Sequence, residues 1–537
     1  MANLFGNVLF NDLKNTILLH PDTEMQNLIL SCIEICEYSQ EVCNAIEADL
    51  DKAAQDAKRE RLRRQELELA ENHPFLDFCF PSEPKSEKEA PSKPQLRLEK
   101  GRNRALTPEA VLVFLQLRGY LGSVTDQTNY NRLKDSSVLS DYLDLRGLNL
   151  PSKACLCETL SKITKETFSL IHKVQLDIVF QDHLDDFSWC GIDSTSIHAS
   201  TDWPTDSSMM HRLLERAYKV GSSLHKFGLA DFASQRIWKG LQELRSLNFE
   251  INLCCGKPRS RKKVRRAYRK VITRTDKVAS EILRQLETRR NKLNATSGIS
   301  GLDRERLQHA FILIEEDVAS ALHVLTYAED RVFNGISLPA AEKIISLSDT
   351  TAAYIKKGNR EPVIGYKPQI CRSGEGFITA FDVQPGNPAD SACLVPLVHQ
   401  HVDMTRCIPE VVSADDGYPS KANFDALNSE DGLKIDTVSF SGSKGKKLLD
   451  SIDEALWKSE NYTSARNDRS SVESIIFTMK FKFHAHSFRR RNINNVRSEL
   501  YEKILAHNSW RLFELRKKNN IPSLLERESE CFLPKAG

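Results

Sequence analysis

The sequence lacks the long apolar runs of a membrane protein. Its predominantly apolar stretches, such as 110–117 and 394–398, fall far short of the roughly 18 to 20 residues that cross a bilayer. Asp12, Asp22 and Glu24 interrupt the apolar positions near the start, which is not typical of a secretory signal peptide. We therefore expect a cytoplasmic protein that has no membrane partner.

Two common classes of binding motif are also missing. The chain has 13 cysteines, but its close pairs do not repeat the Cys-x-x-Cys spacing that closes a zinc tetrahedron. We interpret them as reduced thiols, most of them buried. No Gly-x4-Gly-Lys string is present, so the sequence gives no support for nucleotide hydrolysis.

The chain is too long, at 537 residues, for a single compact core. Apolar residues at helical spacing predict an N-terminal helical module over 1–72. Five prolines among Ser, Glu and Lys predict a disordered linker over 73–104. Thr107, followed by Pro108, is typical of the start of a helix and opens a helical domain predicted over 105–185.

Strand signals lie on both sides of a long helical segment. One strand is predicted within 187–198, and a hairpin over 362–371 and 376–383. Further along, helices alternate with short strands at 411–412 and 437–440, and the last helix covers 470–483. The order strand, hairpin, helix, strand, helix, strand, helix predicts an α/β fold, of mixed α+β type, with a mixed sheet.

Three acids stand out by their place in these elements. Asp193 lies inside an apolar strand, where an acid needs a partner or a metal ion, and Asp415 ends a short strand before Gly417. Glu473 lies on the last helix, four residues after Arg469. Acids on separate elements of a mixed sheet can converge at one edge and hold two divalent ions for phosphodiester chemistry. Solvated surface acids are the alternative, because the chain has 73 acids.

These motifs in combination resemble the DDE transposases of bacterial insertion sequences. The resemblance rests on Asp193 in Gly-Ile-Asp-Ser-Thr, Asp415 in Ala-Asp-Asp-Gly-Tyr, and the string Arg469-x3-Glu473-x6-Lys480. The last string is similar to the Tyr-x2-Arg-x3-Glu-x6-Lys signature of one large clan, with Arg466 in place of the tyrosine.

The resemblance implies a ribonuclease-H-like fold in which Asp193, Asp415 and Glu473 bind two Mg²⁺ or Mn²⁺ ions. It further implies that Arg469 and Lys480 contact phosphates near the cut. The partners would be double-stranded DNA, namely transposon ends and target. It also implies a homodimer in the DNA complex and association with the nucleoid when bound to DNA.

The resemblance also assigns the regions. The catalytic core would comprise 186–200 and 361–490, and 105–185 would serve DNA binding or assembly. Asp193 and Asp415 are 222 residues apart, whereas Asp415 and Glu473 are only 58 apart. We therefore expect a basic helical insertion over 201–360, and a basic helical tail over 491–537.

Two stretches concentrate positive charge and predict salt-sensitive contacts with DNA phosphates. The residues chosen as DNA contacts in the first stretch are Arg261, Lys262, Lys263, Arg265, Arg266, Arg269 and Lys270, and those in the second are Arg489, Arg490 and Arg491. A solvated helix face is the alternative for the first stretch. Near the second, Phe481, Phe483 and Phe488 are predicted to pack in the core rather than to stack on bases.

The sequence therefore predicts a transposase that cuts DNA and joins the 3′ hydroxyl to a target. Two alternatives remain open from the residues. One is a metal-dependent nuclease on the same core that cuts without joining, and the other is a transposase-derived protein that only binds DNA. The presence of all three acids argues against the second alternative.

Overall fold

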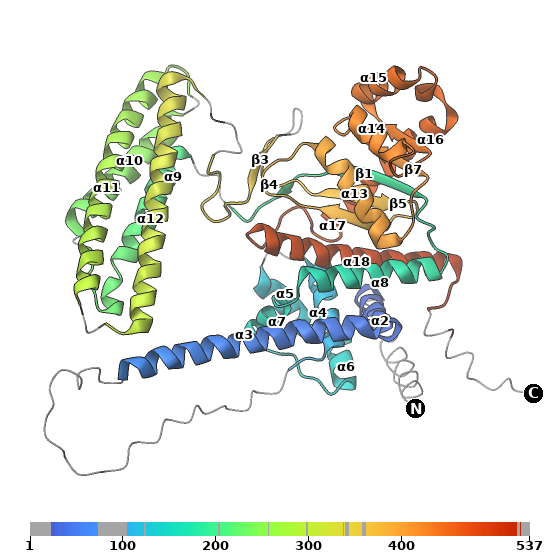
Figure 1. Ribbon diagram of the computed structural model, residues 1–537, viewed down its shortest axis with the longest axis horizontal. Helices are drawn as coiled ribbons and strands as arrows, with labels where there is room; N and C mark the ends of the chain where they lie inside the picture. The colour runs from blue at the N-terminus through green and yellow to red at the C-terminus, as the bar shows by residue number, and fades with distance from the viewer. Residues whose placement is uncertain are drawn as a thin grey trace, which may run out of the picture. The chain divides into compact units, whose positions relative to one another are not determined.

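The computed structural model divides the chain into two compact units (Figure 1). Unit 1 comprises Met1–Ala53, Arg104–Thr201 and Ser348–Gly537, and unit 2 comprises Ala54–Asn103 and Asp202–Leu347. The structure describes residues 23–72, 105–122, 125–201, 205–232, 234–255, 257–296, 299–336, 338, 343–356, 361–523 and 527. The predicted linker, 73–104, lies outside these residues. Within them, no helix is both long enough and apolar enough to span a membrane.

A five-stranded mixed sheet forms the centre of unit 1. Its strands are β1 (Trp189–Ser194), β5 (Gln369–Ser373), β6 (Ile378–Asp382), β7 (Val411–Ala414) and β8 (Thr437–Phe440). They lie in the order β6-β5-β1-β7-β8, with β5 antiparallel to β1 and β6, and with β7 and β8 parallel to β1. This mixed sheet with its flanking helices confirms the predicted α/β fold and is consistent with a ribonuclease-H-like domain.

The hairpin differs in one respect from the sequence prediction. Instead of one strand over 362–371, the chain forms β4 (Val363–Tyr366) and then β5. β4 belongs to a separate three-stranded sheet with β2 (Ile197–His198) and β3 (Ala353–Ile355). Pro368 lies at the interruption, where it has no N–H group to donate to a strand ladder. The break falls opposite the gap between β1 and β2, so both strands of the ribbon are interrupted together.

Helices cover both faces of the five-stranded sheet. Cys190 and Ile192 of β1 point into a buried cluster that includes Leu394 and Leu397 of α13 (Asp390–Thr405). The opposite face of β1 packs against α17 (Ser470–Phe481). Gly191 permits this approach, because a Cβ atom there would lie 2.6 Å from a methyl carbon of Val472. The close contact brings the first turn of α17 beside the end of β1.

Unit 1 contains further helices (Figure 1). Those between and after the parallel strands are α14 (Lys421–Asn428), α15 (Gly442–Ile452) and α16 (Glu460–Asp468). The rest are α2 (Thr23–Tyr38), the first part of α3 (Gln40–Asn72), α4 (Pro108–Leu121), α5 (Asp126–Lys134), α6 (Ser137–Leu145), α7 (Lys153–Leu160), α8 (Lys165–Gln181) and α18 (Ile493–Asn519). Thr107 caps α4 as predicted, since its Oγ1 accepts a hydrogen bond from the Ala110 N–H at 3.2 Å.

Helix α18 lies within the core of unit 1, although it falls in the segment expected as a tail. It packs against α2, α4 and α8, and even its charged residues Glu499, Glu502 and Lys503 are buried. Arg118 of α4 forms two hydrogen bonds with Glu502, at 2.8 and 2.6 Å. The N-terminal helix α2 is therefore joined to the same packed body through α4 and α18.

Unit 2 is helical and has its own core. It contains α9 (Asp206–Gly221), α10 (Ser234–Cys254), α11 (Arg261–Ala295) and α12 (Gly301–Glu329), and its buried residues form one apolar cluster. The apolar positions of α11 recur at helical spacing, for example at Val271, Val278 and Ile282, so one face is buried and the other keeps its charges in solvent.

Candidate active site

The three predicted acids lie on elements that meet at one edge of the five-stranded sheet. Asp193 is near the end of β1, and Asp415 follows the last residue of β7, the parallel neighbour of β1. Glu473 is in the first turn of α17, which packs on β1. The carboxyl ends of adjacent parallel strands lie side by side, which explains why acids far apart in sequence become neighbours.

Arg469 lies among all three carboxylates. Its Nη2 donates a hydrogen bond to Glu473 Oε1 at 2.8 Å, while its Nη1 lies 3.6 Å from Asp193 Oδ2 and 3.8 Å from Asp415 Oδ1. The guanidinium and Asp193 are largely buried, with side-chain exposures of 16% and 14%, whereas Glu473 is 61% exposed. Because of this exposure, a large substrate can reach the site from the side of Glu473.

The carboxylates surround the guanidinium rather than an open metal position. Among the described residues, no group of three or more His, Cys, Asp or Glu side chains is arranged to hold a metal ion. Arg469 Nη1 is buried and forms no hydrogen bond with the described residues, although two carboxylates lie within 4 Å of it. The site thus gathers three negative charges around one positive charge.

The neighbouring acids Asp415 and Asp416 have different surroundings. Asp415 Oδ1 accepts a hydrogen bond from Ser441 Oγ at 2.8 Å. Asp416 Oδ1 instead accepts hydrogen bonds from the backbone N–H groups of Lys444 at 2.7 Å and Gly445 at 3.1 Å. These N–H groups belong to the first turn of α15, so Asp416 acts as a cap for that helix.

Gly442 makes this cap possible. Its φ is +77°, and a Cβ atom there would lie 2.4 Å from Cγ of Asp416. Any larger residue would have to adopt the left-handed region and would also clash with the capping carboxylate. The turn from β8 into α15 therefore fixes Asp416 and leaves Asp415 to face Arg469.

A buried polar network, which the sequence did not predict, supports the turn after Asp415. Tyr418 donates a hydrogen bond to Gln369 Oε1, and Gln369 Nε2 donates to Asp390 Oδ1 at 2.8 Å. Asp390 also pairs with Lys367 Nζ at 2.8 Å. Burial, together with Asp390 and Asp193, raises the pKa of Tyr418, so its hydroxyl stays a donor at neutral pH. The sequence signal that could have indicated this network is the pair Gly417-Tyr418, which directly follows the two acids.

Comparison with known protein families identifies the same part of the chain. Residues 342–509 match the family model described as transposase DDE domain. This part of the chain is a transposase DDE domain. No curated protein and no solved structure gives a significant match to the chain.

The matched range includes Asp415, Arg469, Glu473 and Lys480 of the DDE domain but not Asp193. β1, which carries Asp193, precedes residues 202–347 of unit 2, whereas the other four strands of its sheet follow them. A match over one continuous range that begins at residue 342 therefore contains four of the five strands and two of the three acids.

Unit 1 also contains Lys480, predicted to contact phosphates near the cut, and the arginines of the second basic stretch, predicted as DNA contacts. Lys480 is half-buried on α17, two turns after Glu473. Arg489 and Arg490 form ion pairs with buried glutamates, Arg489 with Glu499 at 3.4 Å and Arg490 with Glu502 at 2.8 Å. These contacts support a structural role for both arginines, because their charge is already compensated.

Arg491 is also engaged within unit 1, since its Nε donates to the carbonyl oxygen of Ser200 at 3.0 Å. Of the three nearby phenylalanines, Phe483 and Phe488 are buried as predicted. The prediction was wrong for Phe481, which is 67% exposed. α17 ends at Phe481 and the chain then turns, so Phe483 enters the core while Phe481 stays on the outer face of the helix.

In unit 2 the predicted basic stretch forms the start of α11. Six of its selected cations, namely Arg261, Lys262, Lys263, Arg266, Arg269 and Lys270, are exposed. Arg265 is different, because its Nε and Nη2 donate to the carbonyl oxygens of Val332 at 3.1 Å and Phe333 at 2.9 Å. Arg265 therefore ties α11 to the end of the α12 segment.

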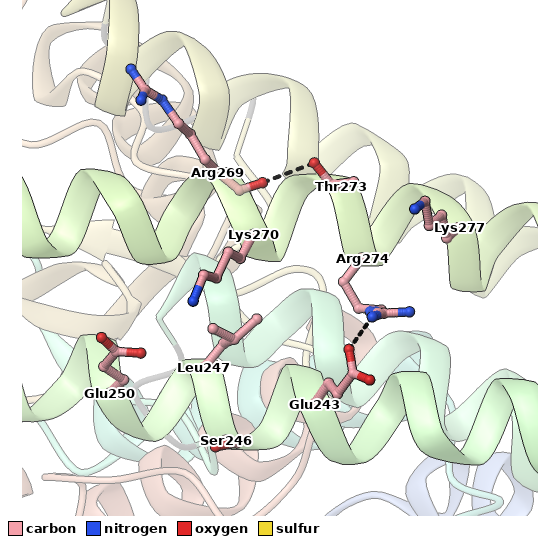
Figure 2. A pocket seen from close by; sticks show the side chains of 9 residues that line it. All are labelled: Glu243, Ser246, Leu247, Glu250, Arg269, Lys270, Thr273, Arg274 and Lys277. Carbon is pink, nitrogen blue, oxygen red and sulfur yellow. Dashed lines mark hydrogen bonds and ion pairs between the residues drawn. The ribbon is translucent and has the colours of Figure 1, made fainter.

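A groove of about 590 Å³ runs between α10 and α11 within unit 2 (Figure 2). Four cations of α11 line one wall, Arg269, Lys270, Arg274 and Lys277, and two acids of α10, Glu243 and Glu250, line the other. Arg274 pairs with Glu243. All four cations of this wall belong to the basic run 257–277 of the sequence.

Proposed function

We propose that this protein is a transposase that cleaves DNA at the ends of its insertion sequence and joins the 3′ hydroxyl to target DNA. The convergence of Asp193, Asp415 and Glu473 on one guanidinium, at the carboxyl end of the DDE-domain sheet, carries this proposal. Three carboxylates at such an edge are the group that metal-assisted phosphodiester chemistry requires.

The chemistry of the donor set fits Mg²⁺ or Mn²⁺. Both ions prefer carboxylate oxygens, so Asp193, Asp415 and Glu473 would hold them. The three carboxylates already surround a cationic group, and divalent ions would compete with Arg469 for them. When bound, two such ions supply an activated attacking oxygen and stabilise the leaving oxygen.

The surrounding side chains would set the orientation of the acids. Arg469 orients Glu473 through the 2.8 Å hydrogen bond, and Ser441 orients Asp415. Arg469 precedes α17 directly and Lys480 lies in its last turn, and both would contact phosphates near the cut. Their positive charges would offset the charge of the DNA backbone where it approaches the carboxylates.

The exposed cations of α11 would bind the DNA backbone. This role is supported by the density of one sign of charge on the solvent face of the helix and by the basic wall of the adjoining groove (Figure 2). Such contacts give affinity that does not depend on sequence and that falls with added salt. Because a transposition complex joins two DNA ends, we further propose that it contains two copies of the chain.

The test is incubation of the purified protein with labelled DNA that carries the flanking inverted repeats, a target plasmid and Mg²⁺ or Mn²⁺. Glu473→Gln removes one carboxylate and should lower the cleavage rate by at least about a hundred-fold. Glu430→Gln is the matched control, because Glu430 is exposed and forms a surface ion pair with Lys434.

Joined product that depends on Glu473 supports the transposase. Nicks without joining would favour the metal-dependent nuclease. Binding without cleavage by the wild-type protein would leave only a DNA-binding role, and cleavage that survives Glu473→Gln would remove this residue from the site.

A further inference from the structure

Two exposed phenylalanines lie on α17, the helix that carries Glu473. Phe477 is 61% exposed and Phe481 is 67% exposed, and their ring centroids are 4.2 Å apart with an interplanar angle of 34°. Phenylalanines at this exposure are individually unremarkable. Their pairing on α17, one and two turns after Glu473, is what requires an explanation.

The spacing places these rings on the face of α17 that carries the acid. At 100° per residue, Phe477 lies about 40° and Phe481 about 80° around the helix from Glu473. The buried residues Val472, Ile475 and Met479 lie on the opposite side and pack towards the sheet. The aromatic pair therefore cannot serve the contact between α17 and the sheet.

We propose that Phe477 and Phe481 form a stacking platform for unpaired DNA bases next to the cut. The proposal rests on the proposed function, because it requires a polynucleotide that is bound at Glu473 and follows this face of α17. With a rise of 1.5 Å per residue, the rings are about 6 and 12 Å along the helix from Glu473. Stacked nucleotides are about 3.4 Å apart, so the platform meets bases roughly two to four nucleotides from the cut.

The charge around the platform favours a nucleic acid over a protein as its occupant. Lys480 lies between the two rings in sequence and about 20° from Glu473 around the helix, so a cation accompanies the aromatic surface. Cations that track the backbone, combined with aromatic rings that stack on bases, are the shared features of surfaces that bind single strands. A base that is still paired and stacked cannot offer its face to the rings, so the platform selects a strand that has been opened.

The test uses the full chain and measures equilibrium binding without divalent metal. One labelled probe is a fully paired transposon end, and the other is the same end with three unpaired nucleotides beside the cut. The wild-type protein should prefer the forked probe. Replacing both Phe477 and Phe481 with Ala should reduce affinity for the forked probe by about ten-fold or more, with little effect on the paired probe.

Two further variants separate stacking from loss of structure. Phe477→Trp keeps an aromatic face and should keep the preference for the fork. Phe249→Ala is the matched control, since Phe249 is 66% exposed on α10 and lies outside α17. A fluorescent base analogue such as 2-aminopurine should be quenched two to four nucleotides from the cut by the wild-type protein and not by the double variant.

Three results would overturn the proposal. The first is the absence of a fork preference in the wild-type protein, and the second is an equal loss of affinity for both probes in the double variant. The third is a double variant that changes only the oligomeric state, which would assign the patch to a contact between copies. Fork preference that depends on the two rings, in a protein that does not cleave DNA, would refute the proposed chemistry and leave the platform standing. Cleavage without fork preference would do the reverse.

Discussion

Replacing Asp415 and Asp416 one at a time tests the proposed division of roles between two adjacent carboxylates. Asp415 faces Arg469 and accepts one hydrogen bond from Ser441, whereas Asp416 accepts two backbone N–H groups of α15. We expect Asp415→Ala to abolish metal-dependent cleavage with little change in stability. We expect Asp416→Ala to destabilise the fold and to leave the cleavage rate within about ten-fold of wild type.

The magnitudes follow from the contacts. Asp416 satisfies two N–H groups in the first turn of a helix and places a negative charge at its positive end, so its loss should cost about 1–2 kcal/mol. Asp415→Ala removes the hydrogen bond from Ser441 and the ion pair with Arg469 at 3.8 Å, but it also relieves the repulsion between Asp415 and Asp193. The losses and the gain oppose one another, and the net change in stability should be below about 1 kcal/mol.

The assays are single-turnover cleavage in Mn²⁺ and thermal denaturation of each variant. Asp416→Asn is a useful third variant, because an amide oxygen can still accept the N–H groups while the charge is gone, and it should recover part of the lost stability. The reasoning is refuted if Asp416→Ala abolishes cleavage in a protein that remains folded, or if Asp415→Ala retains wild-type activity.

Two further predictions concern stability against pH and DNA affinity. Burial acts to raise the pKa of Glu502, but Arg118 and Arg490 outweigh it and lower the pKa to about 2. The depressed pKa contributes stability that is present above about pH 4.5 and is lost as the pH falls towards 2. Glu502→Gln should therefore lower the free energy of unfolding by about 3 kcal/mol at pH 7 and by roughly half of that at pH 3. Urea denaturation at the two pH values measures this difference. Replacing both Arg266 and Lys270 with Ala should reduce the slope of log affinity for DNA against log salt concentration by about one unit per lost phosphate contact. Arg284→Ala, on the same helix, is the control and should leave the slope unchanged. Equal slopes for all variants would show that this face of α11 is merely solvated.

Local sequence patterns predicted the elements that carry the acids. Asp193 within an apolar strand and Asp415 before a glycine turn were recognisable because strand ends in such sheets present functional side chains. The central position of Arg469 was not predictable, because it depends on how α17 packs on Gly191 of β1. The role of Asp416 as a helix cap was not predictable either, because it depends on the turn that follows β8.

Charge patterns were less informative than strand patterns for a related reason. Arg265, Arg489 and Arg490 belong to dense basic runs, but each is held by carbonyl or carboxylate groups of its own unit. A run of one sign of charge does not tell which members face a buried partner. Exposure of Phe481 was missed similarly, because its position relative to the helix end decides whether the ring enters the core.

The meeting of Asp193 and Asp415 across 222 residues follows from the way the chain leaves and re-enters unit 1. Ser348 Oγ donates a hydrogen bond to Thr201 Oγ1 at 3.2 Å, so the two ends of the segment 202–347 are held side by side. That segment folds around its own apolar cluster, and the cost of closing a chain segment rises only slowly with its length. β1 therefore pairs with β5 and β7 whatever the length of the chain segment between β1 and β5. The geometry of the three acids is then determined by contacts within unit 1 and not by the inserted segment.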